Sequence, residues 1–247
     1  MTTHLIRPLM TAFAFLTRLP IRAGVISDDD LGRSVGFFPL VGLVLGFAIA
    51  GLAYAADRLF PPPMTAVLVT IALAAVTGGL HLDGLSDLFD GLGGGQGNRE
   101  KTLAIMRDSR IGAQGAIAVF LGLGAKIAAA STLIEDGDFL ALAAIPVIGR
   151  FAVGPAIVLF PYARAEGLGR AFNGRARPPQ LVIAALITGA VILGLGPTLV
   201  AAALGALGVT LLLAVALRLH LGGLTGDIYG AIIEIAEVTA AFLAVLR

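Results

Sequence analysis

Cysteine and tryptophan are absent from this 247-residue chain, and charged residues are scarce at 13%. The absence of cysteine excludes disulfide bonds, thiolate zinc sites and cysteine nucleophiles, although it leaves the cellular compartment undecided. Soluble domains usually contain about a quarter charged residues, so the charge is roughly halved here. No block rich in Lys and Arg occurs and the formal net charge is only +1, so nothing indicates a nucleic-acid partner.

Apolar residues make up 57% of the chain and form long runs that few charges interrupt. A helix needs about 20 apolar residues to cross the hydrocarbon core of a bilayer. Seven spans are predicted: 34–56, 59–80, 111–134, 139–163, two within 178–217 on either side of Gly196-Pro197, and 228–246. We therefore expect an all-α, polytopic helix bundle embedded in membrane lipid.

The positive charges favour one orientation, because cytoplasmic loops of membrane proteins carry an excess of Lys and Arg. If the N-terminus is cytoplasmic, only Arg58 and Arg247 lie on the opposite side of the membrane, and Lys126 and Arg150 lie within spans. The residues that fall inside are Arg7, Arg18, Arg22, Arg33, Arg99, Lys101, Arg107, Arg110, Arg164, Arg170, Arg175, Arg177 and Arg218. This distribution predicts a multi-pass inner-membrane protein.

Residues 1–247 are predicted to form a single membrane domain with two distinct cytoplasmic parts. The first is an N-terminal cytoplasmic or interfacial segment, 1–33, and the second is a motif loop, 81–110. Arg7 and Arg18 interrupt the apolar stretch 5–21, and no clean cleavage site follows it. We therefore expect 5–21 to be an amphipathic segment at the cytoplasmic membrane surface rather than a signal peptide.

Three aspartates stand at the cytoplasmic end of the second span. Asp83, Asp87 and Asp90 are spaced i, i+4 and i+7, which places them within about 60° on one face of a helix. Carboxylates so placed repel one another unless a cation joins them, and Mg²⁺ prefers such oxygen ligands together with substrate phosphates. The spacing favours a Mg²⁺ site over the simpler alternative, a solvated acidic helix end.

Basic residues follow in the same predicted loop and again after the fourth span. Lys101, Arg107 and Arg110, with Asp108 and Ser109, are typical of a site that grips a diphosphate beside a metal. Two simpler readings remain open, since cytoplasmic loops are basic in any case and Asp108 and Ser109 could cap the next helix. Arg164 and Glu166 form a weaker patch, either a substrate contact or an ordinary loop.

The last motif begins at Thr225 and enters the final span. Asp227 lies at its cytoplasmic entrance, and Glu234 is seven residues further, so both can face one crevice. Ionisable groups within a span are costly and therefore candidates for function. For Glu234 and Glu237, pairing with Lys126 and Arg150 is an equally open alternative.

Six stretches, in order, resemble the cobalamin (5′-phosphate) synthase family, the adenosylcobinamide-GDP ribazoletransferases. They are Leu-Thr-Arg-Leu-Pro at 16–20, Phe-Pro-Leu-Val-Gly at 38–42, His-Leu-Asp-Gly-Leu-Ser-Asp at 81–87, Met-Arg-Asp-Ser-Arg-Ile-Gly at 106–112, Arg-Ala-Glu-Gly-Leu-Gly at 164–169 and Thr-Gly-Asp-Ile-Tyr-Gly-Ala at 225–231. The resemblance implies a Mg²⁺-dependent enzyme of the cytoplasmic membrane. It would join adenosylcobinamide-GDP to α-ribazole or its 5′-phosphate, release GMP and form adenosylcobalamin or its phosphate.

Together, the motifs and the resemblance assign a role to each candidate residue. Asp83, Asp87, Asp90 and Asp227 are predicted to be catalytic, and the first three to hold the metal. Substrate binding is predicted for His81, Lys101, Arg107, Asp108, Ser109, Arg110, Arg164, Glu166, Thr225 and Glu234. The general base stays open among Asp87, Asp90, His81 and Asp227. An oligomer is compatible with the sequence.

Two other functions are weighed against this one. Asp83-Gly84 and Asp90-Gly91 are similar to the Asp-Gly pairs of membrane CDP-alcohol phosphotransferases, but the Ala-Arg element and the later pair of aspartates in that motif are missing. The charges within the spans would suit a small-solute transporter. A transporter, however, predicts polar groups near the middle of the membrane, whereas most acids here gather at cytoplasmic span ends.

Overall fold

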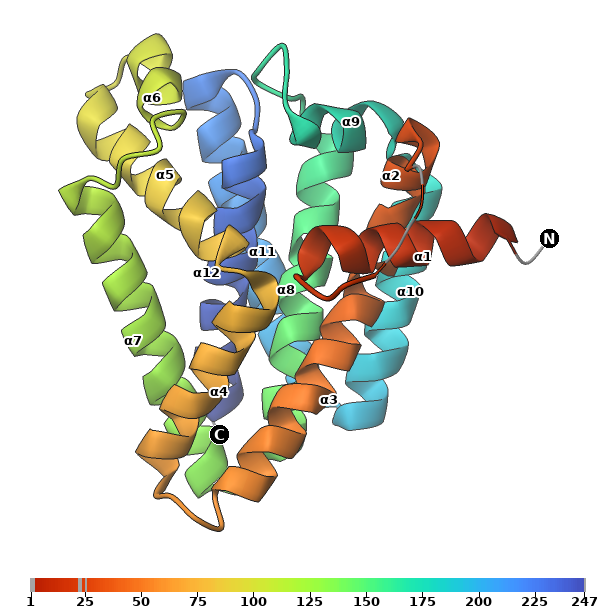
Figure 1. The fold of residues 1–247 in the computed structure, drawn as a ribbon, viewed down its shortest axis with the longest axis vertical. Helices are drawn as coiled ribbons and strands as arrows, with labels where there is room; N and C mark the ends of the chain where they lie inside the picture. The colour runs from red at the N-terminus through yellow and green to blue at the C-terminus, as the bar shows by residue number, and fades with distance from the viewer. Residues whose placement is uncertain (1–2, 22–23, 25, 247) are drawn as a thin grey trace.

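The computed structural model describes residues 3–21, 24 and 26–246, and within these ranges the chain is helical (Figure 1). Arg22 and Arg247, two of the charges used to predict orientation, lie outside the described residues. The helices are α1 (Thr3–Leu16), α2 (Asp28–Ser34), the 3₁₀ turn η1 (Val35–Phe37), α3 (Phe38–Ala56), α4 (Pro62–Thr77), α5 (Leu80–Gly95), α6 (Arg99–Ile105), α7 (Ala113–Glu135), α8 (Phe139–Leu159), α9 (Leu168–Arg175), α10 (Pro178–Leu195), α11 (Leu199–Leu221) and α12 (Gly226–Val245).

Six helical segments in the described part of the chain are long and apolar enough to cross a membrane, and a bent pair raises the number to seven. The six are the continuous stretch Asp28–Ala56, α7, α8, α10, α11 and α12, and the bent pair is α4 with α5. The all-α, polytopic fold is therefore confirmed. The predicted division of 178–217 is confirmed as well, because α10 ends at Leu195 and α11 begins at Leu199.

Helix α8 lies at the centre of the bundle, and most of its residues are buried. Helix α3 packs closely against it through two glycines. A Cβ at Gly42 would overlap the carbonyl oxygen of Pro146 on α8, and a Cβ at Gly46 would overlap that of Ala143. Such small residues allow close helix packing in a membrane, where lipid supplies no hydrophobic force between helices. Outer helices α10 and α11 instead expose leucines such as Leu186 and Leu212, as expected for a surface that faces lipid.

A sharp bend separates α4 from α5 and gives the acidic motif its position. Gly78 and Gly79 both have left-handed backbone angles, with φ of 64° and 69°, which glycine adopts without steric cost. The two helix axes differ by 89°. The expected motif loop 81–110 is thus largely helical, because it contains α5 and α6. Helix α5 crosses α12 closely, since a Cβ at Gly84 would overlap the backbone of Asp227.

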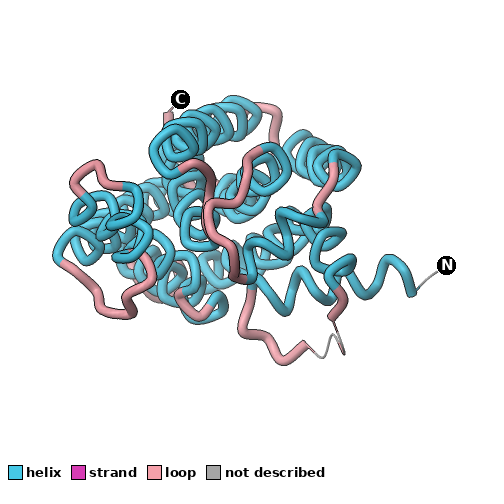
Figure 2. Tube along the Cα trace, turned by 90° about the horizontal axis from the view of Figure 1, so that it is seen from above, coloured by secondary structure: helices cyan, strands magenta, loops and turns pink. Residues whose placement is uncertain are grey.

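Helix α1 runs across the other helices rather than along them, and its N-terminal end projects from the side of the bundle (Figures 1 and 2). The expected amphipathic segment 5–21 is confirmed as a helix only as far as Leu16. The chain then turns to meet the end of α4, where the Arg18 amide donates a hydrogen bond of 2.7 Å to the carbonyl of Val76. The Arg18 side chain also packs on Gly78. The α4–α5 bend is therefore held from the N-terminal segment.

The contact between α3 and α8 gives a prediction about stability. Gly46→Ala should destabilise the protein by about 1–3 kcal/mol, because the methyl group has no space against Ala143. Gly51→Ala is the matched control on the same helix, since its Cβ would meet nothing within 4 Å. It should leave stability unchanged or raise it by about 0.4–1 kcal/mol. The apparent melting temperatures of the two variants in detergent measure these changes in stability. Equal melting temperatures for Gly46→Ala and Gly51→Ala would contradict the packing described.

Candidate functional site

Two aspartates of the acidic motif face an open, polar cavity beside the α4–α5 bend. Asp83 and Asp87 line it, and its volume is about 370 Å³. The other charged or hydroxyl-bearing residues of the lining are Arg18, Ser86, Ser109 and Arg110. The charge of Asp87 interacts with those of Asp83, Asp227 and Asp90, and with the opposite charge of Arg164. The structure thus brings together the acidic motif and part of the predicted basic motif.

Asp90 lies on the same helix but has a structural role of its own. One carboxylate oxygen accepts a hydrogen bond of 2.7 Å from the Gly112 amide, and the other accepts one of 2.8 Å from the Gly115 amide. These amides belong to the start of α7, so Asp90 caps that helix from a distant part of the chain. A Cβ at Gly112 or Gly115 would overlap the Asp90 carboxylate, which explains both glycines.

A metal at this motif would need ligands beyond the protein. Among residues 3–21, 24 and 26–246, no three His, Cys, Asp or Glu side chains are grouped closely enough to hold an ion. Since Mg²⁺ typically takes one or two carboxylates and completes its shell with water and phosphate oxygens, Asp83 and Asp87 suit it as a pair. A third ligand from Asp90 stays a prediction.

Asp227 stands at the start of α12, where three segments meet. Its carboxylate forms an ion pair of 2.8 Å with Arg164 and accepts a hydrogen bond of 3.3 Å from the Thr225 hydroxyl. Thr225 also caps α12 by accepting from the Ile228 amide. The segment that holds Arg164 is fixed by a backbone bridge between Tyr162 and Leu224. The predicted site residues Arg164, Thr225 and Asp227 therefore belong to one arrangement.

A second cavity, of about 320 Å³, opens on the other side of Asp83. Its polar lining comprises His81, Asp83, Tyr162, Arg164, Asp227 and Tyr229, and much of the remainder is apolar. Burial raises the pKa of the Tyr162 hydroxyl above its ordinary value, and the positive charges of Arg164 and Arg107 act against that rise. The exposed side chain of Arg107 thus lies near enough to influence this cavity.

The remaining predicted loop residues lie at or near the surface of the protein. Lys101 on α6 and Glu166 are exposed. Arg110 pairs with Asp108 at 2.5 Å, and its hydrogen bonds lower the pKa of the Asp108 carboxyl to about 2. Asp108 therefore contributes to the shape of this loop by holding Arg110. Sequence reasoning assigned no role to Arg99, whose Nε donates a bond of 2.6 Å to the Leu221 carbonyl at the end of α11.

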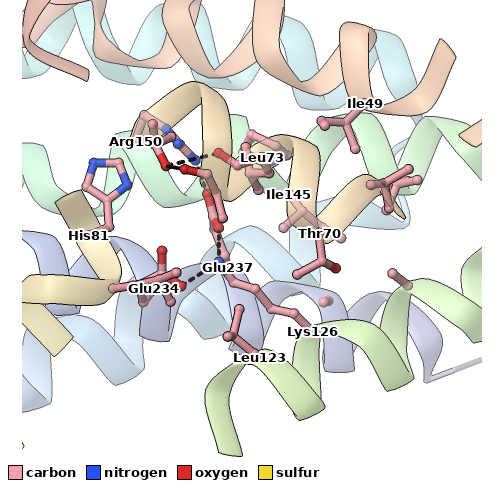
Figure 3. A pocket seen from close by; sticks show the side chains of 18 residues that line it. Ile49, Thr70, Leu73, His81, Leu123, Lys126, Ile145, Arg150, Glu234 and Glu237 are labelled. Atoms are coloured by element: carbon pink, nitrogen blue, oxygen red, sulfur yellow. Dashed lines mark hydrogen bonds and ion pairs between the residues drawn. The ribbon is translucent and has the colours of Figure 1, made fainter. Parts of the chain in front are cut away.

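Glu234 does not face the Asp227 cavity. It forms an ion pair of 2.6 Å with Lys126, which also pairs with Glu237, and Glu237 in turn pairs with Arg150 (Figure 3). The expectation of one crevice for Asp227 and Glu234 is corrected, because seven residues of helix separate them by about 10 Å along the axis. The alternative pairing with Lys126 and Arg150 is confirmed.

The fold and the site define a polytopic helical membrane protein with carboxylates and arginines around two adjoining cavities. The sequence model of the cobalamin-5-phosphate synthase family matches residues 8–245. The chain is similar to proteins named adenosylcobinamide-GDP ribazoletransferase from Roseiflexus sp., 43% identical over 94% of this chain and 87% of the relative, and from Syntrophobacter fumaroxidans, 42% identical over 92% and 94%. No solved structure matches it.

The chain therefore belongs to the cobalamin-5-phosphate synthase family. It is an enzyme, a membrane transferase of cobalamin synthesis. A third relative with the same name, from Geotalea daltonii, is 40% identical over 95% of both chains. Since these relatives are matched over nearly their whole length, the family assignment covers both cavities.

The buried ion pairs give a second prediction about stability. Glu237→Gln should destabilise the protein by about 3–5 kcal/mol, because it leaves buried cations without their carboxylate. Adding Arg150→Met should recover part of the loss, since the Lys126–Glu234 pair then stands alone. The control is Arg175→Met, which removes only exposed pairs and should cost at most about 1 kcal/mol. Equal melting temperatures for Glu237→Gln and Arg175→Met would contradict this account.

Proposed function

We propose that this enzyme joins adenosylcobinamide-GDP to α-ribazole or its 5′-phosphate, with release of GMP. The names of the close relatives support this reaction. The observation that carries the proposal is the pair of carboxylates, Asp83 and Asp87, that share a polar cavity with Arg18 and Arg110. Such a site suits a diphosphate, because arginines bind phosphate oxygens and carboxylates bind the accompanying cation.

Mg²⁺ is the proposed cofactor, held by Asp83 and Asp87 and completed by diphosphate oxygens and water. When bound, it supplies positive charge that offsets the charge developing on the phosphate oxygens. The mutual repulsion of Asp83 and Asp87 supports this assignment, since a divalent cation would relieve it. Ser109 and Arg110, from the loop before α7, border the same cavity and would bind non-bridging oxygens.

The chemistry converts the phosphoanhydride of the diphosphate into a phosphodiester. A ribose hydroxyl of the ribazole attacks the phosphorus that bears cobinamide, a new phosphorus–oxygen bond forms, and the bond to GMP breaks. The hydroxyl proton must pass to a base, and Asp227 is placed for this role because it shares a cavity with Asp83. Its ion pair with Arg164 holds the carboxylate in this position.

The cytoplasmic orientation is also part of the proposal. The loops around α6 and α9 lie at one end of the bundle, and the α3–α4 connection with Arg58 lies at the other (Figure 1). An excess of Arg and Lys at the first end supports its placement in the cytoplasm of the inner membrane, where nucleotide substrates are present. The organisation of 1–247 as one membrane domain stays a prediction.

The two alternative functions lose their support. A transporter was motivated by charges within the spans, and these charges are paired with one another. The CDP-alcohol phosphotransferase motif is incomplete, and the chain belongs to a different family.

The proposal predicts different effects for two aspartates on the same helix. Purified protein in detergent, given adenosylcobinamide-GDP, α-ribazole and Mg²⁺, should release GMP and form adenosylcobalamin, and EDTA should stop the reaction. Asp83→Asn should lower kcat/KM by about 10²-fold or more, as expected when a metal ligand is lost. Asp90→Asn keeps one capping oxygen and should change the Mg²⁺ dependence little.

Two outcomes would contradict these assignments. Absence of turnover by well-folded wild-type protein would exclude the reaction. An equal shift in Mg²⁺ dependence for Asp83→Asn and Asp90→Asn would make Asp90 a metal ligand, as the sequence predicted.

A further inference from the structure

The cavity of about 320 Å³ beside Asp83 has an aromatic wall built by three separate segments. Phe15 comes from α1, Phe38 from the start of α3 and Phe172 from α9. The ring centroids of Phe15 and Phe172 are 4.5 Å apart, and those of Phe38 and Phe172 are 5.9 Å apart. Helix α8 adds Val153 and Ile157. This cavity therefore has the size and the largely apolar lining of a small-molecule site.

The charge of this cavity differs from that of the polar cavity across α5. Its one cationic side chain, Arg164, is already paired with Asp227 at 2.8 Å. A diphosphate would find two carboxylates, Asp83 and Asp227, beside a single arginine, so the net charge of the lining is negative even though Arg164 Nε and Nη2 have no hydrogen bond of ordinary geometry, and this is unfavourable. An uncharged aromatic group, by contrast, can pack against phenylalanine rings in tilted or edge-to-face arrangements.

Buried polar atoms at the rim of the aromatic wall also point to a ligand. His81 is 3% exposed, and its Nε2 has no hydrogen-bond partner within the described ranges. The hydroxyl of Tyr229, 6% exposed, lies near Asn173 without a hydrogen bond of ordinary geometry. Both residues line this cavity, and His81 also borders the cavity that contains Lys126 and Arg150. Since buried polar groups are nearly always hydrogen-bonded, these two are suited to the ring nitrogen and hydroxyls of a nucleoside.

We infer that this cavity binds the aromatic base of the nucleoside substrate. The inference rests on the proposed function, in which that nucleoside is the ribazole. Asp83 borders both cavities, so a ribose placed beside Asp83 and Asp227 would point its hydroxyl toward the diphosphate on the other side of α5. The base then lies among Phe15, Phe38 and Phe172. Helix α1, which contributes no predicted catalytic residue, thereby becomes part of the nucleoside site.

The test compares two phenylalanines of the same helix. Phe15→Ala removes part of the cavity wall, whereas Phe13→Ala removes an equally half-buried ring that does not line the cavity. Equilibrium dialysis in detergent measures the binding of α-ribazole, and steady-state kinetics give KM for each substrate. Phe15→Ala should weaken α-ribazole binding about tenfold, in keeping with the loss of one base–aromatic contact, and should leave the KM for adenosylcobinamide-GDP unchanged. Phe13→Ala should change neither quantity.

The outcomes separate this inference from the proposed function. If wild-type protein forms product and Phe15→Ala binds α-ribazole as tightly as Phe13→Ala does, the inference is wrong and the reaction stands. If Phe15→Ala instead raises the KM for adenosylcobinamide-GDP alone, the cavity belongs to the other substrate. Wild-type protein that neither binds α-ribazole nor releases GMP would exclude both.

Discussion

The site depends on the close crossing of α5 and α12 after the bend at Gly78 and Gly79. Two left-handed residues in succession turn the chain by 89° at the end of an apolar run, so that α5 continues across α12 instead of leaving the bundle. Gly84 then allows the backbone of α5 to touch that of α12 at Asp227. Without this contact, Asp83 on α5 and Asp227 on α12 would not line a common cavity.

The buried ion pairs beneath this crossing fix the position of α12. Lys126, Arg150, Glu234 and Glu237 form a group with two charges of each sign, and Glu237 lies against Gly149 at the centre of α8. Burying such charges is expensive unless each has its counterpart, so few alternative arrangements of α7, α8 and α12 are acceptable. We expect this group to stabilise the geometry of the site above it without contacting substrate.

The sequence predicted those features that depend on local pattern. Apolar runs of about 20 residues located the spans, Gly196-Pro197 located a turn, and the i, i+4, i+7 spacing located three aspartates on one helix. Features that depend on distant residues could not be predicted. Asp90 accepts a hydrogen bond from an amide 22 residues later, and Arg99 contacts a carbonyl 122 residues away. Hydropathy also does not reveal the direction in which a chain continues after a turn, so the course of α5 across α12 could not be predicted.

A structure with adenosylcobinamide-GDP and Mg²⁺ bound, determined by electron cryomicroscopy, would test the central claim most directly. The account predicts the diphosphate in the polar cavity, with the metal on Asp83 and Asp87 and with Arg18 and Arg110 near its oxygens. The aromatic cavity on the other side of α5 should then stay free for the second substrate. A diphosphate bound among Phe15, Phe38 and Phe172, or at the Lys126–Glu237 group, would contradict it.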